Sequence, residues 1–191
     1  IAYCGAIQAL DELGILHYLK RFAGTSAGCV PALFLALGLD ATQAKKETDE
    51  LDMNSFFDGG SAIPVHSKWK KGSNLFKRLG IHPADRCIEY FGDLLEKYMG
   101  DRDLTFLGLF QRFGTELCIT VSNLSRHQSE FCHVNTTPDL PIRLAIRASM
   151  SIPFLWEPAQ LVDGECYVDG SVFNNYPLKA FDGWLLSTKT E

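Results

Sequence analysis

The chain has 191 residues, of which 46% are hydrophobic and 21% are charged. These values are typical of one folded globular domain and exclude a disordered, collagen-like or coiled-coil chain. The formal net charge of −5 argues against nucleic acid as a partner, because its binders use a positive field to hold phosphates. The longest nearly unbroken apolar run, Cys29 to Leu39, is about half the ~20 residues needed to cross a bilayer. We therefore predict a single domain over residues 1–191 without a transmembrane segment.

The first half of the chain predicts helices around one short strand. Apolar residues recur at spacings of three and four after Gly5, which is the pattern of an amphipathic helix. The short segment Arg21–Gly24 predicts a strand, and the helix that follows it ends at Gly38. The predicted helices span 5–19, 27–37, 40–52 and 84–99.

The second half of the chain predicts most of the sheet. Segments 116–122 and 130–134 are β-branched and apolar, and a polar linker separates them. A short helix is predicted over 141–148, with proline in its first turn. Residues 161–168 predict a hairpin around Asp163 and Gly164. Helices that alternate with apolar strands predict an α/β fold, with a mostly parallel central sheet flanked by helices.

The cysteines show neither a Cys-x-x-Cys pair nor a nearby His-x-x-x-His, so we expect no zinc site. No calcium loop of the Asp-x-Asp-x-Asp-Gly kind occurs either, and we expect no metal or other cofactor. Several lie inside apolar stretches, which suits free buried thiols in a reducing compartment. We therefore expect a cytoplasmic protein that can contact membranes peripherally. The six cysteines are Cys4, Cys29, Cys87, Cys118, Cys132 and Cys166.

The segment Gly24-Thr25-Ser26-Ala27-Gly28 matches Gly-x-Ser-x-Gly, the nucleophile elbow. In this motif a sharp turn from a strand into a helix exposes the serine hydroxyl above a sheet. We expect a side chain at either glycine to collide with the neighbouring strand or helix. The helix N-terminus can stabilise negative charge that develops beside the serine. Ser26 is therefore the candidate nucleophile.

A serine nucleophile needs a base, which is most often a histidine. No histidine follows residue 133, whereas the α/β-hydrolase order Ser, acid, His requires one near the C-terminus. His133 is the one alternative base that the sequence offers, because the other histidines fit surface positions. An ordinary triad is disfavoured, although a histidine esterase that uses His133 stays open.

A carboxylate beside the hydroxyl can also serve as the base. Asp-Gly pairs begin at Asp58, Asp163, Asp169 and Asp182, and most such pairs are turns. Asp163 fits the hairpin turn. Asp169 ends an apolar strand and precedes a glycine, which is where an α/β sheet places site residues. The spacing alone leaves a catalytic and a structural role for Asp169 equally open.

The chain resembles the patatin-like phospholipases over nearly its whole length. The resemblance rests on a series of motifs in order: GAIQALDELGI, FAGTSAG, DLTFLGL, ELCITVSNL, IRASMSIPFLWEP and YVDGSVFNNYP. It implies the patatin-like three-layer sandwich and a Ser-Asp dyad, in which Ser26 attacks an ester carbonyl and Asp169 accepts its proton. It also suggests that the apolar loop 149–156 packs near the site, although core packing explains this loop equally well.

Two features depart from the pattern of the family. The third motif, Asp-Gly-Gly or Asp-Gly-Ala, reads Asp169-Gly170-Ser171 here, and we expect this small residue to fit. The glycine-rich oxyanion loop of the family would lie immediately before Ile1. We expect the native chain to extend upstream and to carry this loop, because losing one oxyanion donor costs about 10²- to 10³-fold in turnover.

Basic residues cluster with Trp69, Leu75 and Phe76, and they suit docking on an anionic lipid surface, a lid over the acyl groove or a solvated loop. They are Lys68, Lys70, Lys71, Lys77 and Arg78.

We predict a carboxylic-ester hydrolase that cleaves fatty-acyl esters of phospholipids or lysophospholipids, with transient membrane contact and no metal. The alternative is a catalytically inactive module of the same fold that binds lipid or serves as a scaffold.

Overall fold

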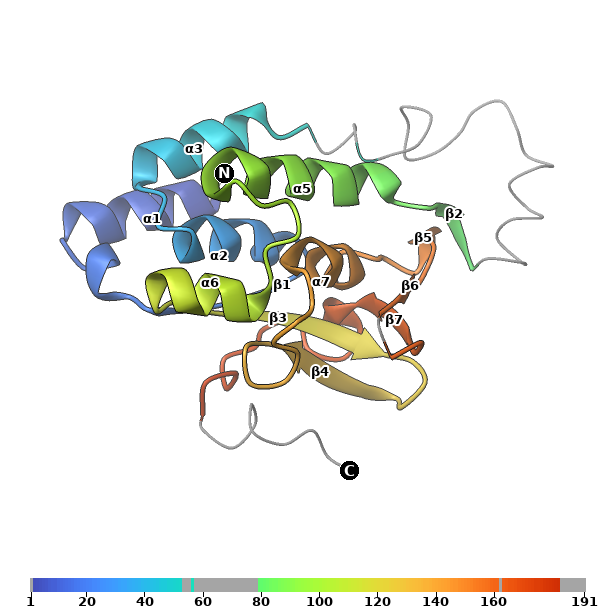
Figure 1. The fold of residues 1–191 in the computed structure, drawn as a ribbon. Coiled ribbons are helices and arrows are strands. Elements are labelled where there is room, and N and C mark those ends of the chain that lie inside the picture. The colour runs from blue at the N-terminus through green and yellow to red at the C-terminus, as the bar shows by residue number, and fades with distance from the viewer. Residues whose placement is uncertain (1, 53–55, 57–78, 162, 183–191) are drawn as a thin grey trace.

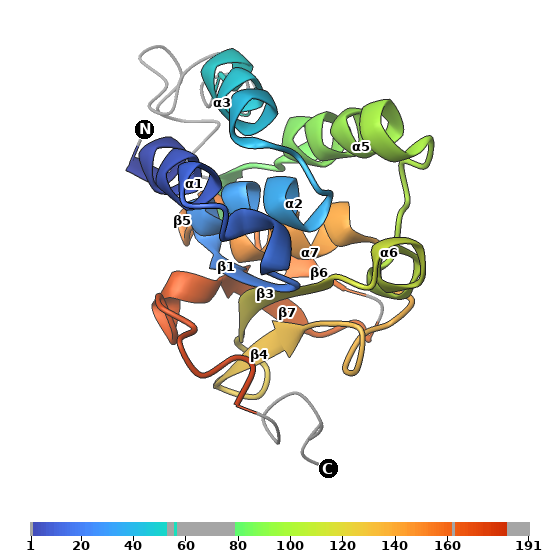
Figure 2. The same ribbon diagram turned by 90° about the vertical axis from the view of Figure 1, so that its left-hand side faces the viewer.

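The computed structural model describes residues 2–52, 56, 79–161 and 163–182. The α-helices of this part lie on the same side of the main sheet, as Figure 1 and Figure 2 show from two directions. They are α1 (Ala2–Glu12), α2 (Cys29–Ala36), α3 (Ala41–Glu50), α5 (Asp85–Met99), α6 (Phe106–Phe113) and α7 (Ile142–Ser149). Short 3-10 turns span Leu16–Tyr18, Ser26–Gly28 and Gly170–Val172. The α/β class predicted from the sequence is confirmed.

The main sheet is mixed, and not mostly parallel as we expected. Its strands are β1 (Arg21–Thr25), β3 (Glu116–Asn123), β4 (Gln128–Cys132), β6 (Ala159–Gln160) and β7 (Cys166–Asp169). β1 runs parallel to β3, whereas the β3–β4, β3–β7 and β6–β7 pairs are antiparallel. The reason is that short links join β3 to β4 and β6 to β7, and such links can connect only antiparallel neighbours. A separate parallel pair is formed by β2 (Gly80–His82) and β5 (Phe154–Trp156).

Two strands share one edge of β3. Thr120 pairs with β4 on one side and with Thr25 of β1 on the other. Val121 pairs with β4 on one side and with Asp169 of β7 on the other. β1 and β7 therefore both lie opposite β4, they run toward each other, and their carboxyl ends meet between Thr120 and Val121. The loops that follow both strands begin at this junction.

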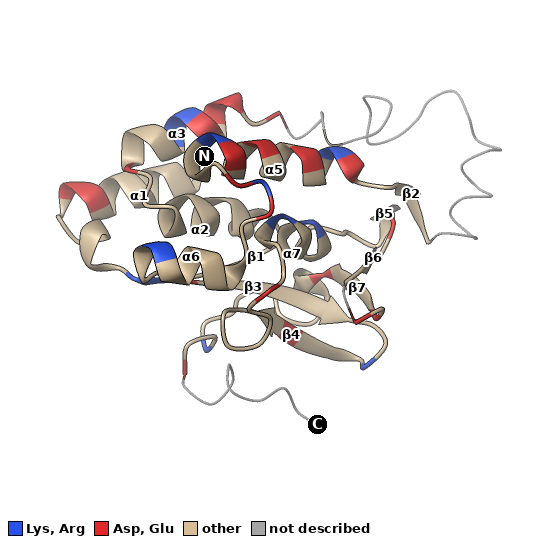
Figure 3. Cartoon of the chain, in the orientation of Figure 1, with Lys and Arg blue, Asp and Glu red and all other residues tan. Residues whose placement is uncertain are grey.

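The hydrophobic core lies between the sheet and the helices. α2 has the uncharged sequence CVPALFLA and buries six of its eight residues, while β3 is buried from Leu117 to Asn123. Charged residues gather instead on the outer helices α3 and α5, as Figure 3 shows. Cys118 points to the other face of the sheet, because side chains alternate along a strand, and it packs there with Ala180 and Phe181. The helix α2 and the strand β3 thus belong to the buried core that adjoins the junction.

Several predicted elements differ in length from those observed. The first helix ends at Glu12, because Gly14 takes a φ of +67° and the chain continues into a 3-10 turn. The hairpin around Asp163 and Gly164 is confirmed, although its first strand lies at 159–160. The sequence analysis did not predict α6. It also missed β2 and β5, because strands of three residues are too short to show a period.

Three further expectations can be compared with the structure. All six cysteines are free thiols, as predicted. Among the described residues, no helix is both long enough and apolar enough to span a bilayer. The cluster of basic and apolar residues between Lys68 and Arg78 lies outside the described residues, as does Asp58.

A capping box between Asp40 and Gln43 closes the N-terminus of α3. Asp40 Oδ1 accepts a hydrogen bond of 2.8 Å from Gln43 N, and Gln43 Oε1 accepts one of 3.1 Å from Asp40 N. Removal of this capping box by Asp40→Ala should lower the free energy of unfolding by about 1 kcal/mol. Thr42→Ala, at an exposed position of the same first turn, should change it by less than about 0.5 kcal/mol. Urea denaturation of both variants makes the comparison, and equal effects would contradict the assignment of the cap.

Candidate active site

Ser26 and Asp169 lie where β1 and β7 meet. Ser26 directly follows the last residue of β1, and Asp169 is the last residue of β7. Ser26 Oγ donates a hydrogen bond of 2.6 Å to Asp169 Oδ2. Asp169 is buried, with 3% of its surface exposed, and Ser26 is partly exposed. The fold therefore brings together the two residues that the sequence analysis selected, although 143 positions separate them in the chain.

The turn that carries Ser26 is sharp and strained. Ser26 has a φ of 53°, in the left-handed region that costs about 1–2 kcal/mol for a residue with a side chain. The chain passes from β1 through the 3-10 turn into α2 without a loop. A Cβ on Gly24 would lie only 2.4 Å from Gly28 O, so a glycine is required at this position. The local geometry is that of a nucleophile elbow.

The second glycine of the motif is less constrained than we expected. A Cβ at Gly28 would meet only the Tyr3 hydroxyl, at 3.5 Å, which is an ordinary contact. The expected collision is thus correct for Gly24 and wrong for Gly28, because Gly28 lies on the partly exposed side of the turn. Of the other motif residues, Ala27 is exposed, and Thr25 is buried with its Oγ1 donating to Asn174 O at 3.2 Å.

The Asp169 carboxylate is fixed on two sides. Its Oδ1 accepts a hydrogen bond of 2.8 Å from Ser171 N, which leaves Oδ2 directed at Ser26. A Cβ on Gly170 would lie 2.3 Å from Thr120 O, so this glycine allows the loop to approach β3 closely. Ser171, where the family has glycine or alanine, is exposed and holds the carboxylate through its backbone. The departure at this position therefore leaves the contact intact.

Two buried serines near the pair were not selected from the sequence. Ser122 Oγ donates to Gly170 O and accepts from Phe173 N, both at 3.3 Å, so it ties the loop after Asp169 to β3. Ser149 Oγ accepts a hydrogen bond of 2.9 Å from Ser26 N. Their partners lie far away in sequence. The available signal for Ser122 was a small polar residue inside an apolar segment, and for Ser149 it was the family resemblance, which suggested that the loop 149–156 packs near the site.

His133 lies at the other end of β3. Its Nε2 is 3.1 Å from Glu116 Oε2, and Glu116 begins β3 opposite Arg21, the first residue of β1. Four residues of β1 separate that end from the junction, which corresponds to about 13 Å along the strand. Burial lowers the pKa of His133, and the Glu116 carboxylate partly opposes this shift. The structure thus pairs His133 with Glu116 and not with Ser26.

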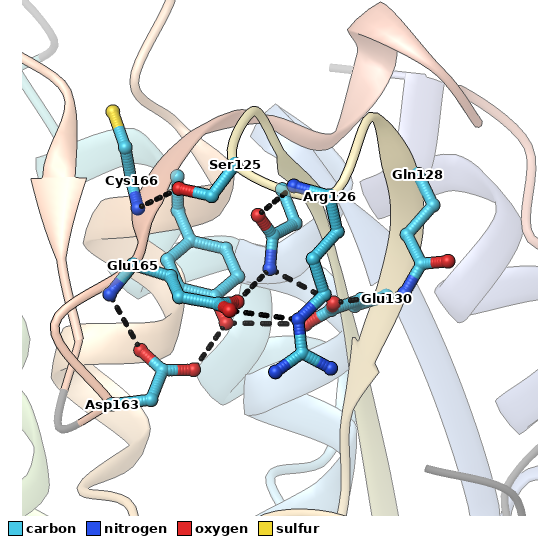
Figure 4. Close-up of polar contacts among 9 residues, drawn as sticks. Ser125, Arg126, Gln128, Glu130, Asp163, Glu165 and Cys166 are labelled. Carbon is cyan, nitrogen blue, oxygen red and sulfur yellow. Dashed lines mark hydrogen bonds and ion pairs between the residues drawn. The ribbon is translucent and has the colours of Figure 1, made fainter. Parts of the chain in front are cut away.

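Asp163 belongs to the turn of the β6–β7 hairpin, as the sequence predicts. Its Oδ1 accepts from Glu165 N at 3.1 Å, and its Oδ2 accepts from the Tyr167 hydroxyl at 2.6 Å. Figure 4 shows this carboxylate beside Glu165, which in turn bonds Arg126 Nε at 2.7 Å. These contacts tie the turn to the β3–β4 connection. Asp163 therefore has a structural explanation that involves neither Ser26 nor Asp169.

Comparison with known proteins decides the family. A family model described as patatin-like phospholipase matches residues 1–182. The chain belongs to the patatin-like phospholipase family.

Individual relatives and one solved structure agree with this assignment. Uncharacterized protein YqhO of Bacillus subtilis is 29% identical, across 98% of this chain and 62% of its own length. The probable lipid hydrolase 463L of Invertebrate iridescent virus 6 is 30% identical, across 91% of this chain and 59% of its own length. The chain thus spans about three fifths of the length of both relatives. The crystal structure of VipD from Legionella pneumophila superposes with a TM-score of 0.64 at 21% identity, covering 92% of this chain and 44% of VipD.

The loop 149–156 contacts both members of the Ser26–Asp169 pair. The resemblance in sequence implied that the loop 149–156 packs beside the site, and Ser149 and Ser151 at its start do contact the pair. Ser151 O accepts a hydrogen bond of 2.9 Å from Asp169 N. The VipD superposition shows that this patatin-like chain has the α/β fold that the resemblance implied.

The two motif glycines should respond differently to the same substitution. Gly24→Ala should destabilise the fold by several kcal/mol or prevent folding, because its Cβ would overlap backbone atoms that cannot move away. Gly28→Ala should fold, and its free energy of unfolding should lie within about 1 kcal/mol of that of the parent, since its Cβ meets only ordinary contacts. Thermal unfolding followed by circular dichroism measures both. A stable Gly24→Ala variant would show that the turn is not as close as described.

Proposed function

We propose that this protein hydrolyses fatty-acyl esters of lipids through a dyad of Ser26 and Asp169. The observation that carries the proposal is the 2.6 Å hydrogen bond from Ser26 Oγ to the buried Asp169 Oδ2. A hydroxyl that already donates to a carboxylate is set to lose its proton to that carboxylate when it attacks an electrophile. Membership of the patatin-like phospholipase family supports an ester bond as the target.

In the first half of the proposed reaction, Ser26 Oγ attacks the carbonyl carbon of the ester while its proton passes to Asp169 Oδ2. The tetrahedral intermediate then collapses, the bond from carbon to the leaving oxygen breaks, and Asp169 returns the proton to that oxygen. The acyl group is left on Ser26. In the second half, Asp169 takes a proton from water, whose oxygen attacks the carbonyl carbon of the acyl-enzyme. The bond from that carbon to Ser26 Oγ then breaks, Asp169 returns the proton to Ser26 Oγ, and the fatty acid leaves.

Negative charge on the carbonyl oxygen requires hydrogen-bond donors during both steps. The backbone N–H of Ala27, directly after the nucleophile, is the donor that a nucleophile elbow provides. The N-terminus of α2, which begins at Cys29, adds a favourable dipole. The glycine-rich loop that the family resemblance predicts before Ile1 would supply further donors.

Phospholipids and lysophospholipids are the substrates that we propose. The family description names phospholipases, and the relative from Invertebrate iridescent virus 6 is named a probable lipid hydrolase. Val172 and Phe173, in the loop that follows Asp169, have exposed apolar side chains. They offer exposed apolar surface within four residues of Asp169, which suits the acyl chain of such a substrate.

The dyad is tested by replacing each member. Ser26→Ala removes the nucleophile, and Asp169→Asn keeps the shape of the side chain but cannot accept the proton. Both variants should fold and should lose hydrolysis by about 10³-fold or more, with little further loss in the double variant, because the two groups act as one unit. The measurement is release of a labelled fatty acid from a phospholipid by the native protein, including any residues encoded before Ile1.

Two matched variants control for general effects of the substitutions. Asp163→Asn makes the same chemical change in a turn, where asparagine can still accept from Glu165 N. His133→Gln removes the one alternative base. Both should keep most of the parent activity. If Asp163→Asn or His133→Gln is inactive while Asp169→Asn stays active, the assignment of Asp169 as the base is wrong. If the parent protein itself is inactive, the alternative of a non-catalytic lipid-binding or scaffolding module is favoured.

A further inference from the structure

The last residue of α7 lies between the elbow and β3. Ser149 has no exposed surface, and its Oγ contacts three different elements. It accepts a hydrogen bond of 2.9 Å from Ser26 N and donates one of 2.6 Å to Thr120 O. The Cys29 thiol, at the start of α2, donates to the same oxygen at 3.2 Å. One hydroxyl thus links the candidate nucleophile, the junction on β3 and the helix behind the elbow.

The three contacts use the full hydrogen-bonding capacity of a hydroxyl group. A serine hydroxyl has one hydrogen to donate and two lone pairs to accept with. Burial raises the pKa of the Cys29 thiol well above its ordinary value, so Cys29 stays neutral and keeps its S–H hydrogen to donate. The Ser149 hydroxyl therefore has one defined orientation. Its hydrogen points to Thr120 O, one lone pair accepts from Cys29, and the other lone pair is left to accept from Ser26 N.

We infer that Ser149 is a positioning residue for Ser26, an inference that rests on the dyad proposed above. Ser26 is held in a left-handed conformation that its side chain disfavours, with φ of 53°. The hydrogen bond from its N–H to Ser149 is a restraint on that conformation from outside the turn. The direction of Ser26 Oγ toward Asp169 depends on the same backbone angles, so loss of the restraint misdirects the nucleophile.

The segment that begins with Ser149 holds the other member of the pair as well. Ser151 O accepts from Asp169 N at 2.9 Å. Ser151 is itself fixed by the buried Arg147, whose Nη1 donates to Ser151 Oγ at 2.9 Å and whose Nη2 donates to Pro83 O at 2.8 Å. Residues 149–151 therefore contact the backbones of both Ser26 and Asp169. Ser149 provides the side-chain contact, which a substitution can remove alone.

The test compares Ser149→Ala with Thr115→Val in the native protein. Thr115 is also buried, and its Oγ1 donates to Ala36 O at 2.9 Å just before the start of β3, at the end remote from the junction. Both changes remove a buried hydroxyl that donates to a backbone carbonyl, so both should lower the melting temperature. If the role of Ser149 is purely structural, the two variants should also have the same kinetic constants and the same hydrogen exchange around Ser26.

The kinetic readout uses a soluble short-chain p-nitrophenyl ester below the melting temperature of each variant. We expect Ser149→Ala to reduce kcat by about 10- to 100-fold with KM within about 3-fold of the parent, because misplacing a reacting group affects the chemical step. Thr115→Val should keep the parent kcat. Hydrogen exchange measured by mass spectrometry should be faster in residues 24–29 of Ser149→Ala and unchanged there in Thr115→Val.

Failure of this inference can be distinguished from failure of the dyad. If Ser26→Ala is inactive while Ser149→Ala keeps the parent kcat and the parent exchange in residues 24–29, the dyad stands and the role of Ser149 is overturned. A loss that appears only in KM would also overturn it. If Ser26→Ala hydrolyses the ester as fast as the parent, the proposed function fails and the positioning role fails with it.

Discussion

The site depends on the meeting of two strands on one edge of β3. Because β1 and β7 run toward each other there, the chain must leave the sheet at both ends, between Thr120 and Val121. Ser26 and Asp169 are the residues at these two exits. The close approach leaves no room for a side chain at Gly24 or Gly170, whose Cβ positions would overlap backbone oxygens. Backbone packing at the junction thus sets the distance between the hydroxyl and the carboxylate.

The junction also explains why hydroxyl side chains are buried around it. Backbone groups at an interrupted ladder need other partners, because an unpaired buried N–H or C=O is costly. Ser149 bonds Ser26 N and Thr120 O, and Ser122 bonds Gly170 O and Phe173 N. Thr25 bonds Asn174 O in the same region. These side chains satisfy the backbone and at the same time hold the turns that carry the proposed dyad.

The sequence predicted the parts of the site that depend on local patterns. The elbow around Ser26 and the strand end at Asp169 follow from glycines and apolar runs that neighbour them in the chain. The mixed sheet could have been inferred from the short β3–β4 linker, which we read only as a separator of two strands. The contacts of Ser149 and Ser122 could not be inferred, because they depend on which strands share an edge. The freedom at Gly28 likewise depends on the three-dimensional position of Tyr3.

Covalent trapping can identify the nucleophile and show whether Asp169 activates it. A fluorophosphonate reacts with an activated serine, and mass spectrometry of the digested native protein locates the adduct. We predict one phosphonyl adduct on Ser26, formed much more slowly when Asp169 is replaced by asparagine. An adduct on a different serine, or labelling of Ser26 that is equally fast without the Asp169 carboxylate, would contradict it.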